Sequence, residues 1–128
     1  YIKELPKYFP ELLRAQKVQK KAASVGFDFE NIDQMVQKLD EEIAELKAEI
    51  KSGNSKNAAD ELGDCIFCLV NISRKLKADS ELCLKSSTDK FIKRFEQVEN
   101  EVIKSGKDFS QYSLQELEDI YQKAKAKL

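Results

Sequence analysis

Residues 31–51 read NIDQMVQKLDEEIAELKAEIK, and residues 56–77 read KNAADELGDCIFCLVNISRKLK. Both stretches carry apolar residues at helical spacing, which predicts two helices that each turn one apolar stripe toward a core. The stripes are Ile32, Met35, Val36, Leu39, Ile43, Leu46 and Ile50 in the first, and Leu62, Cys65, Ile66 and Leu69 in the second. Ser52-Gly53-Asn54 is a turn signal, and such a short connection predicts antiparallel neighbouring helices.

Acidic residues line one flank of each apolar stripe. At about 100° per residue, Glu42, Glu45 and Glu49 share a flank in the first stretch, where Lys38 also falls. Glu61 and Asp64, spaced i, i+3, share a flank in the second. On adjacent antiparallel helices these carboxylates converge and repel one another. A hard divalent cation relieves that repulsion, and ligands that are all oxygen suit Mg²⁺ or Mn²⁺.

The alternative for these carboxylates is an ordinary solvated helix surface. Lys38 and Glu42 at i, i+4 form a common surface pair, so no single glutamate is informative alone. Asp64 is the exception, because it adjoins Cys65–Ile72, the most apolar stretch of the chain. Burial of a lone carboxylate there would be costly without a partner.

The rest of the chain also favours helices. Gly and Pro are scarce, with four and two copies, and we expect an all-α fold of about five antiparallel helices with a four-helix core. Residues 1–128 then form a single domain, expected to be excised from a longer chain or processed, since it starts at Tyr1. The expected helices span about residues 10–24, 31–51, 56–77, 80–105 and 113–128. Residues 65–72 could also be a buried strand, but no helix breaker separates them from their flanks.

Two cations sit beside the apolar stripe of the expected fourth helix. Lys90 and Arg94 are spaced i, i+4 on one flank, an arrangement that suits an anionic substrate bridging cations and metal. Two snorkelling side chains or a structural salt bridge explain the same spacing equally well. Asn71, about two turns beyond the acidic flank, either contacts substrate or makes a buried structural hydrogen bond.

Composition excludes several classes of function. With 22 basic and 23 acidic residues the net charge is −1, so we expect no nucleic-acid partner. No apolar run is long enough for a membrane span, and no signal peptide is visible. Three cysteines indicate a reducing, cytoplasmic setting, with Cys65 and Cys68 as small buried residues. Histidine is absent, which excludes Ser-His-Asp triads and histidine bases.

Taken together, these motifs resemble one known family. Glu41-Glu42-Ile43-Ala44-Glu45, a spacer of fifteen residues and Glu61-Leu62-Gly63-Asp64 match the EExxE…ExxD motif of the MazG nucleotide pyrophosphohydrolases. The segment 90–95, KFIKRF, resembles that family's KFxxRF element. The likeness extends over about residues 5–125, nearly the whole chain.

The resemblance implies a helical homodimer that hydrolyses NTPs or dNTPs to the monophosphate and pyrophosphate. It implies Glu42, Glu45, Glu61 and Asp64 as ligands of Mg²⁺, with Mn²⁺ as a substitute, and Glu41 in a supporting or water-orienting role. It further implies phosphate contacts from Lys90 and Arg94, with Lys38 as a weaker candidate, and Tyr121 as a platform for the base. Thr88 departs from the Asn, and Tyr121 from the Trp, that relatives carry.

Two alternatives stay open from the residues themselves. One is another all-α nucleotide pyrophosphohydrolase, dUTPase-like or phosphoribosyl-ATP-cleaving. The other is a non-catalytic helical interaction domain whose acidic flank is a solvated face. The preferred base and sugar, the number of metal ions and the physiological role stay open as well.

Overall fold

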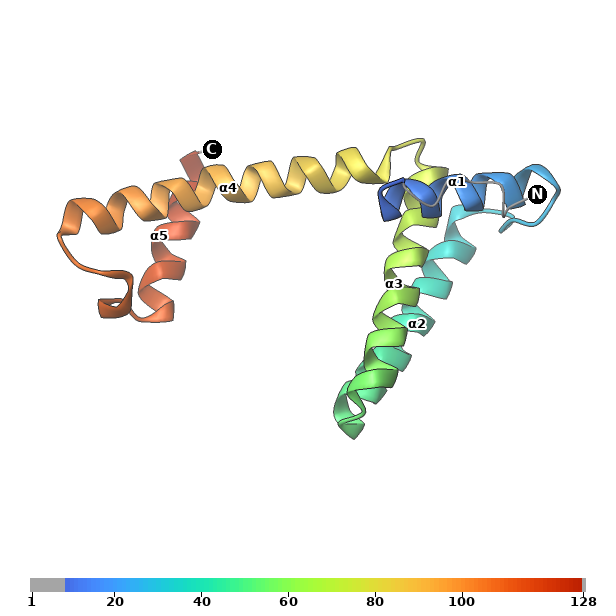
Figure 1. Ribbon diagram of the computed structural model, residues 1–128, viewed down its shortest axis with the longest axis horizontal. Helices are drawn as coiled ribbons and strands as arrows, with labels where there is room; N and C mark the ends of the chain where they lie inside the picture. Colours follow the sequence, from blue (N-terminus) through green and yellow to red (C-terminus); the bar gives the residue numbers. More distant parts are fainter. Residues whose placement is uncertain (1–8, 128) are drawn as a thin grey trace. The chain divides into compact units, whose positions relative to one another are not determined.

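The computed structural model describes residues 9–127 and is helical (Figure 1). Within that range it contains five α-helices, one 3-10 helix and no strand, which confirms the all-α class and the choice of helix for residues 65–72. The elements are α1 (Glu11–Ser24), α2 (Ile32–Ser52), α3 (Ser55–Lys75), α4 (Ser80–Ser105), η2 (Phe109–Gln111) and α5 (Leu114–Lys127). The described residues form two compact units, divided between Cys83 and Leu84.

Local capping signals define both ends of the central hairpin. The Asn31 side chain accepts a hydrogen bond from the Gln34 amide at 3.0 Å and starts α2. Gly53 ends that helix in the left-handed region, at φ 78°, where a side chain would be strained. Asn54 then caps α3 by accepting from the Asn57 amide at 3.0 Å. The turn predicted from Ser52-Gly53-Asn54 is therefore confirmed.

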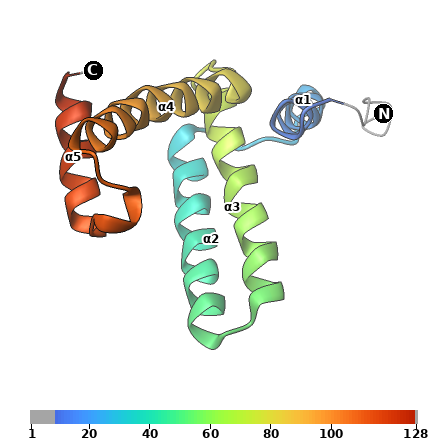
Figure 2. The same ribbon diagram turned by 60° about the vertical axis from the view of Figure 1, so that its left-hand side comes forward.

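In the first unit, α2 and α3 run antiparallel and lie side by side (Figures 1 and 2). Met35 of α2 and Cys65 and Cys68 of α3 are buried in this unit. Helix α1 packs on α3, where the Gln19 amide donates to the Phe67 carbonyl at 2.9 Å. The unit is a helical hairpin with one covering helix, and it sets the register between the acidic flanks.

One part of the expected core is exposed. The stripe on α3 was predicted to face a core, and Cys65 does, but Leu62, Ile66 and Leu69 are each 43–52% exposed. These three lie about 100° around α3 from Glu61, whereas α2 covers only the side of Glu61 and Cys65. A single partner helix contacts a narrow line, so an apolar stripe this wide is not covered by one neighbour.

The second unit has a small core and a row of aromatic rings. Val98 and Val102 of α4 and Ala124 of α5 are buried. The rings of Phe91 and Phe95 stack with centroids 5.8 Å apart. Tyr121 extends this row at 5.8 Å from Phe91, and Phe109 extends it at 5.9 Å from Phe95. No helix among the described residues is both long and apolar enough to cross a membrane.

Candidate active site

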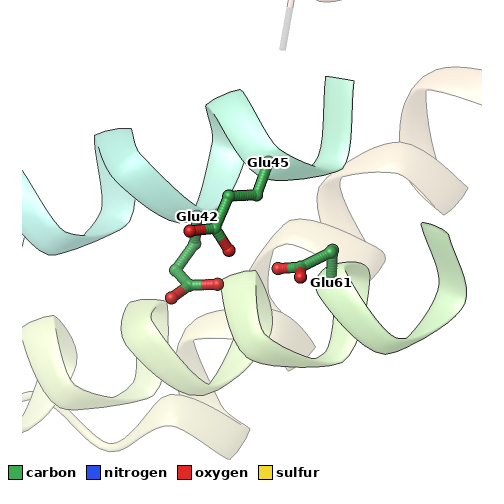
Figure 3. Close-up of side chains that lie close together, drawn as sticks. All are labelled: Glu42, Glu45 and Glu61. Carbon is green, nitrogen blue, oxygen red and sulfur yellow. The ribbon is translucent and has the colours of Figure 1, made fainter. Parts of the chain in front are cut away.

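Three glutamates from α2 and α3 converge on one point (Figure 3). Glu42 and Glu45 lie on successive turns of α2, because a spacing of three residues keeps them on one helix face. Glu61 reaches the same point from α3, since the hairpin places that helix alongside α2. One carboxylate oxygen from each lies within 4.8 Å of the other two. The predicted convergence of acidic flanks is present for these three side chains.

Among the described residues, Glu42, Glu45 and Glu61 form a carboxylate cluster with one ion-pair partner, Lys38. Lys38 Nζ lies 3.0 Å from Glu42 Oε1, as the i, i+4 spacing predicted. Glu42 Oε2 and Glu61 Oε2 are buried and have no hydrogen-bond partner among residues 9–127. A buried carboxylate oxygen without a partner is costly, so the cluster lacks a neutralising group.

The pKa values of two members of the cluster are shifted in opposite directions. Burial, reinforced by the neighbouring Glu42 and Glu45, raises the pKa of Glu61 to about 7. The Lys38 ammonium lowers the pKa of Glu42, against the opposing effect of burial. Two carboxyl groups this close do not ionise independently, so the cluster titrates as a unit when no cation is bound.

The donor set fits a hard divalent cation. All three side chains offer carboxylate oxygens, the ligands that Mg²⁺ prefers. The two unpartnered buried oxygens, Glu42 Oε2 and Glu61 Oε2, are the observation that supports this fit. Glu42, Glu45 and Glu61 would hold the ion, and the rest of its coordination would come from water, substrate or a further carboxylate.

Two other acidic residues of the predicted site lie outside the cluster. Glu41 is exposed on α2. Asp64 is exposed on α3, one turn beyond Glu61, and is therefore not the buried carboxylate that its apolar neighbours suggested. Exposure follows from the open stripe, because the apolar residues beside Asp64 are themselves uncovered in the described chain.

The predicted cations belong to the second unit. Lys90 is exposed and Arg94 half-buried on α4, and Tyr121 packs on Phe91 from α5. Their convergence with the carboxylate cluster stays a prediction. Asn71 belongs to the first unit and accepts a hydrogen bond from Arg74 Nη2 at 3.0 Å, which is the structural hydrogen bond foreseen as one of its two roles.

The cysteines behave as small apolar residues. Cys65 and Cys68 are buried and free, as predicted from their place in the α3 stripe. Burial raises the pKa of both thiols, and the nearby Glu42 carboxylate adds to the effect. Both thiols therefore stay protonated at neutral pH, which disfavours them as metal ligands.

Sequence reasoning missed the ion pair that fixes the link between α1 and α2. Arg74 donates to Asp28 through two nitrogens, at 2.6 and 3.2 Å. This bidentate contact lowers the pKa of Asp28 to about 2. Asp28 lies between two phenylalanines in the link, and that position was the one sequence feature that could have indicated a cationic partner. Gln19 was missed too, because one buried amide on a helix leaves no spacing pattern.

Comparison with known proteins shows the family to which the chain belongs. A family model described as the MazG nucleotide pyrophosphohydrolase domain matches residues 30–103, more than half of the chain. A nucleoside triphosphate pyrophosphohydrolase of Escherichia coli K12 is 35% identical over 124 residues, which are 95% of this chain and 47% of that protein. A Thermotoga maritima protein named nucleoside triphosphate pyrophosphohydrolase/pyrophosphatase MazG is 33% identical over 124 residues, covering 97% of this chain and 48% of its own length.

A more distant relative shares a shorter stretch. The uncharacterized protein YabN of Bacillus subtilis is 35% identical over 69 residues, which are 54% of this chain and 14% of that protein. The chain thus spans about half the length of the two longer matches. The family model covers both helices of the hairpin and the whole carboxylate cluster. The chain belongs to the MazG nucleotide pyrophosphohydrolase domain family.

Proposed function

We propose that this domain hydrolyses nucleoside triphosphates to the monophosphate and pyrophosphate in a Mg²⁺-dependent reaction. The observation that carries the proposal is the pair of buried, unpartnered oxygens on Glu42 and Glu61 within a MazG domain. A domain that kept these glutamates for stability alone would pair them. The specific ion is part of the proposal, and Mn²⁺ offers the same oxygen-seeking chemistry.

The proposed roles combine the positions of the three clustered glutamates with the resemblance to the family motifs. Glu42, Glu45 and Glu61 hold the cation, and Asp64, one turn further along α3, completes the set once substrate is bound. Glu41 orients water. Lys90 and Arg94 hold the phosphates, with Lys38 as an additional contact released when the cation replaces it at Glu42.

In the reaction itself, water forms a bond to one phosphorus of the α–β anhydride and the bridging P–O bond breaks. The departing phosphate oxygen takes the bonding electron pair, and the proton of the water passes to a carboxylate. A bound divalent cation supplies charge neutralisation at the phosphate oxygens and lowers the pKa of a coordinated water. Lys90 and Arg94 stabilise charge on the leaving group through charge-assisted hydrogen bonds.

We also propose that the active form is a homodimer, and that the four-helix core forms between two copies. Leu62, Ile66 and Leu69 form a continuous exposed stripe on α3. Two hairpins that pack these stripes together would bury them in a four-helix arrangement. The odd number of cysteines, three, supports a reducing cytoplasmic setting.

The test is to incubate the protein with each NTP and dNTP plus Mg²⁺ and identify the products by ³¹P NMR. Monophosphate and pyrophosphate are expected, and Glu61→Gln should abolish them while the helical circular dichroism persists. Diphosphate with orthophosphate would place the cleavage at another bond. Absence of any product would favour a non-catalytic helical domain.

A further inference from the structure

The turn between α3 and α4 is held by the side chain of one residue of α1, Gln16. Its Nε2 donates a hydrogen bond to the Ala78 carbonyl at 3.0 Å. Its Oε1 accepts two hydrogen bonds from Ser80, one from the amide at 2.9 Å and one from the hydroxyl at 2.7 Å. Ser80 is the first residue of α4 and is only 7% exposed. A side-chain amide with both ends engaged keeps one orientation, so Gln16 fixes this turn on α1.

The first turns of α1 and α4 are also joined by Glu81. Helix α1 begins after Pro10, whose side chain provides no cap for the amides of the first turn. The Glu81 carboxylate accepts a hydrogen bond from one of these amides, that of Leu13, at 3.3 Å. Asp79 caps α4 itself by accepting from the Leu82 amide at 3.1 Å. The start of α4 is thus attached to α1 through one side chain from each helix.

The backbone of the turn adopts a conformation that needs such support. Lys77 has φ 58°, in the left-handed region that residues with a side chain rarely occupy. The Ala78 amide donates to the Ser73 carbonyl at 2.9 Å, which closes the end of α3. A conformation of this kind persists where the surrounding contacts determine it. Gln16 provides one of these contacts, at the carbonyl of the residue that follows Lys77.

Helix α4 continues from this junction without interruption to Ser105. Lys90 and Arg94 follow Ser80 by about 15 and 21 Å along the helix axis, at about 1.5 Å per residue. A tilt of about 5° at the first turn displaces a side chain at that distance by about 2 Å. A misplacement of about 1 Å can lower the rate of a catalysed reaction about 100-fold. The start of α4 is therefore a sensitive point for both cations.

We propose that Gln16 is a positioning residue for the hydrolysis of the nucleotide. By holding the first turn of α4, it orients the helix that carries Lys90 and Arg94, the two residues proposed to contact phosphate. The inference rests on the proposed function for the roles of these two cations. Gln16 itself contacts neither the nucleotide nor the metal ion in this role, and it acts only through the helix that it holds.

The alternative is that the contacts of Gln16 only stabilise the fold. Their loss would then lower the melting temperature, and any effect on turnover would be independent of the cations on α4. In the proposed role the loss acts through Lys90 and Arg94, so it has less effect once one of these residues has been removed. A double-mutant cycle between Gln16 and Arg94 therefore separates the two roles.

The experiment measures kcat/KM for pyrophosphate release by the whole chain with Mg²⁺, at a temperature where circular dichroism shows every variant to be folded. Gln16→Met keeps the size of the side chain and removes its three hydrogen bonds, so it should lower kcat/KM about tenfold. In the Arg94→Ala background the same substitution should cost at most about threefold. Ser80→Ala loses the hydroxyl but keeps the amide donor, so its kcat/KM should fall between those of the parent and Gln16→Met.

A matched control and a second readout exclude a general loss of structure. Lys20→Met, at an exposed position of the same helix, should stay within about twofold of the parental kcat/KM. The hydrogen bonds of Gln16 involve no member of the carboxylate cluster, so calorimetry should give Gln16→Met the parental Mg²⁺ affinity.

Three results would overturn the positioning role when the parent is active. They are an unchanged kcat/KM in Gln16→Met, an equal loss from this substitution in the parent and Arg94→Ala backgrounds, and a fall in Mg²⁺ affinity as large as the fall in turnover. Each of them would leave the proposed function standing. A parent that releases no pyrophosphate would refute the proposed function and the positioning role together.

Discussion

Glu61 of α3 and Glu42 of α2 face each other across the hairpin, and each has one buried carboxylate oxygen without a hydrogen-bond partner among the described residues. Such a pair destabilises the fold unless a proton or a cation sits between its members. The pKa of Glu61, raised to about 7 by burial and by its neighbours, is the protein's response when no cation is present. The crowded carboxylates thus lower the stability of the metal-free hairpin and provide ligands for a cation.

Replacing Glu61 by Gln should therefore separate stability from metal binding. Without metal, Glu61→Gln should melt at the same temperature as the parent or higher, because one of three crowded charges is gone. With Mg²⁺ at about 100 times its Kd the parent should gain about 2.7 kcal/mol of unfolding free energy. The variant should gain almost none. Thermal melts at increasing Mg²⁺ measure both effects.

Asp40→Asn is the matched control, since Asp40 is an exposed carboxylate of the same helix as Glu42. It should keep the full response to Mg²⁺. An undiminished Mg²⁺ response in Glu61→Gln would remove Glu61 from the site.

Lys38→Met should strengthen metal binding. Lys38 lies 3.0 Å from Glu42 and occupies one of the oxygens that a cation would use. Removing it should lower the melting temperature of the metal-free protein slightly and raise Mg²⁺ affinity about two- to fivefold, as expected for a half-exposed ion pair. Isothermal calorimetry measures the affinity. Weaker Mg²⁺ binding in this variant would show that the Lys38 ammonium does not compete with the ion.

The sequence predicted the helices because their signals are local. Gly53 ends α2, as the turn signal at Ser52-Gly53-Asn54 predicted. The Asn31 cap and the Ser113–Glu116 capping box likewise act within a few residues, with Glu116 accepting from the Ser113 amide at 2.9 Å. The convergence of Glu42, Glu45 and Glu61 was also predictable, because a short turn fixes the register of a hairpin.

Contacts between segments far apart in the sequence could not be predicted. The Asp28–Arg74 pair joins residues 46 positions apart, and no periodicity links a loop to a helix end. The exposure of Asp64 could not be predicted from its apolar neighbours. An amphipathic pattern indicates that an apolar face is to be buried, but it does not identify the segment or the chain that covers it. Both cases depend on tertiary packing, which a helical repeat does not encode.

The Asp28–Arg74 pair should make the free energy of unfolding depend on pH in the acidic range. The Arg74 guanidinium lowers the pKa of Asp28 to about 2 from an ordinary value of 3.8. A lowered folded-state pKa contributes stability above pH 4, and that contribution is lost as the pH falls from about 4 toward 2. Asp28→Asn should therefore cost about 1 kcal/mol at pH 7, after screening by solvent, and almost nothing near pH 2. Urea unfolding at several pH values measures the difference.

Glu11→Gln is the comparison for that experiment. Glu11 pairs with Arg14 at 2.8 Å within one exposed helical turn, so its loss should cost clearly less stability than the loss of Asp28 at pH 7. If the two variants lose equal stability, the Asp28 contact does not anchor the link.

Lys90→Ala and Arg94→Ala should weaken turnover without weakening metal binding. Both residues are proposed to contact phosphate, and neither belongs to the carboxylate cluster. Loss of one charge-assisted hydrogen bond to a developing charge lowers kcat/KM about 10- to 100-fold. Lys93→Ala, an exposed neighbour on α4, should leave kcat/KM near the parental value. A fall in Mg²⁺ affinity in either variant, measured by calorimetry, would contradict the phosphate role.

Ile66→Glu should disrupt the proposed dimer. Ile66 is 43% exposed at the centre of the stripe that also contains Leu62 and Leu69. A charge there costs little in a lone hairpin, where water reaches the side chain, but it is expensive when a second copy covers the stripe. Light scattering on a sizing column should show a dimer for the parent and a monomer for the variant. Circular dichroism should show that the variant's helices persist.

Lys47→Glu provides the control for that experiment, because it changes charge on the exposed surface of α2 and should stay dimeric. Activity then distinguishes two kinds of dimer. A monomeric Ile66→Glu that still hydrolyses nucleotides would show that one carboxylate cluster suffices for the reaction. A monomer that binds Mg²⁺ but releases no pyrophosphate would show that the second copy completes the substrate site. A parent protein that is itself monomeric at all concentrations would refute the four-helix core between two copies.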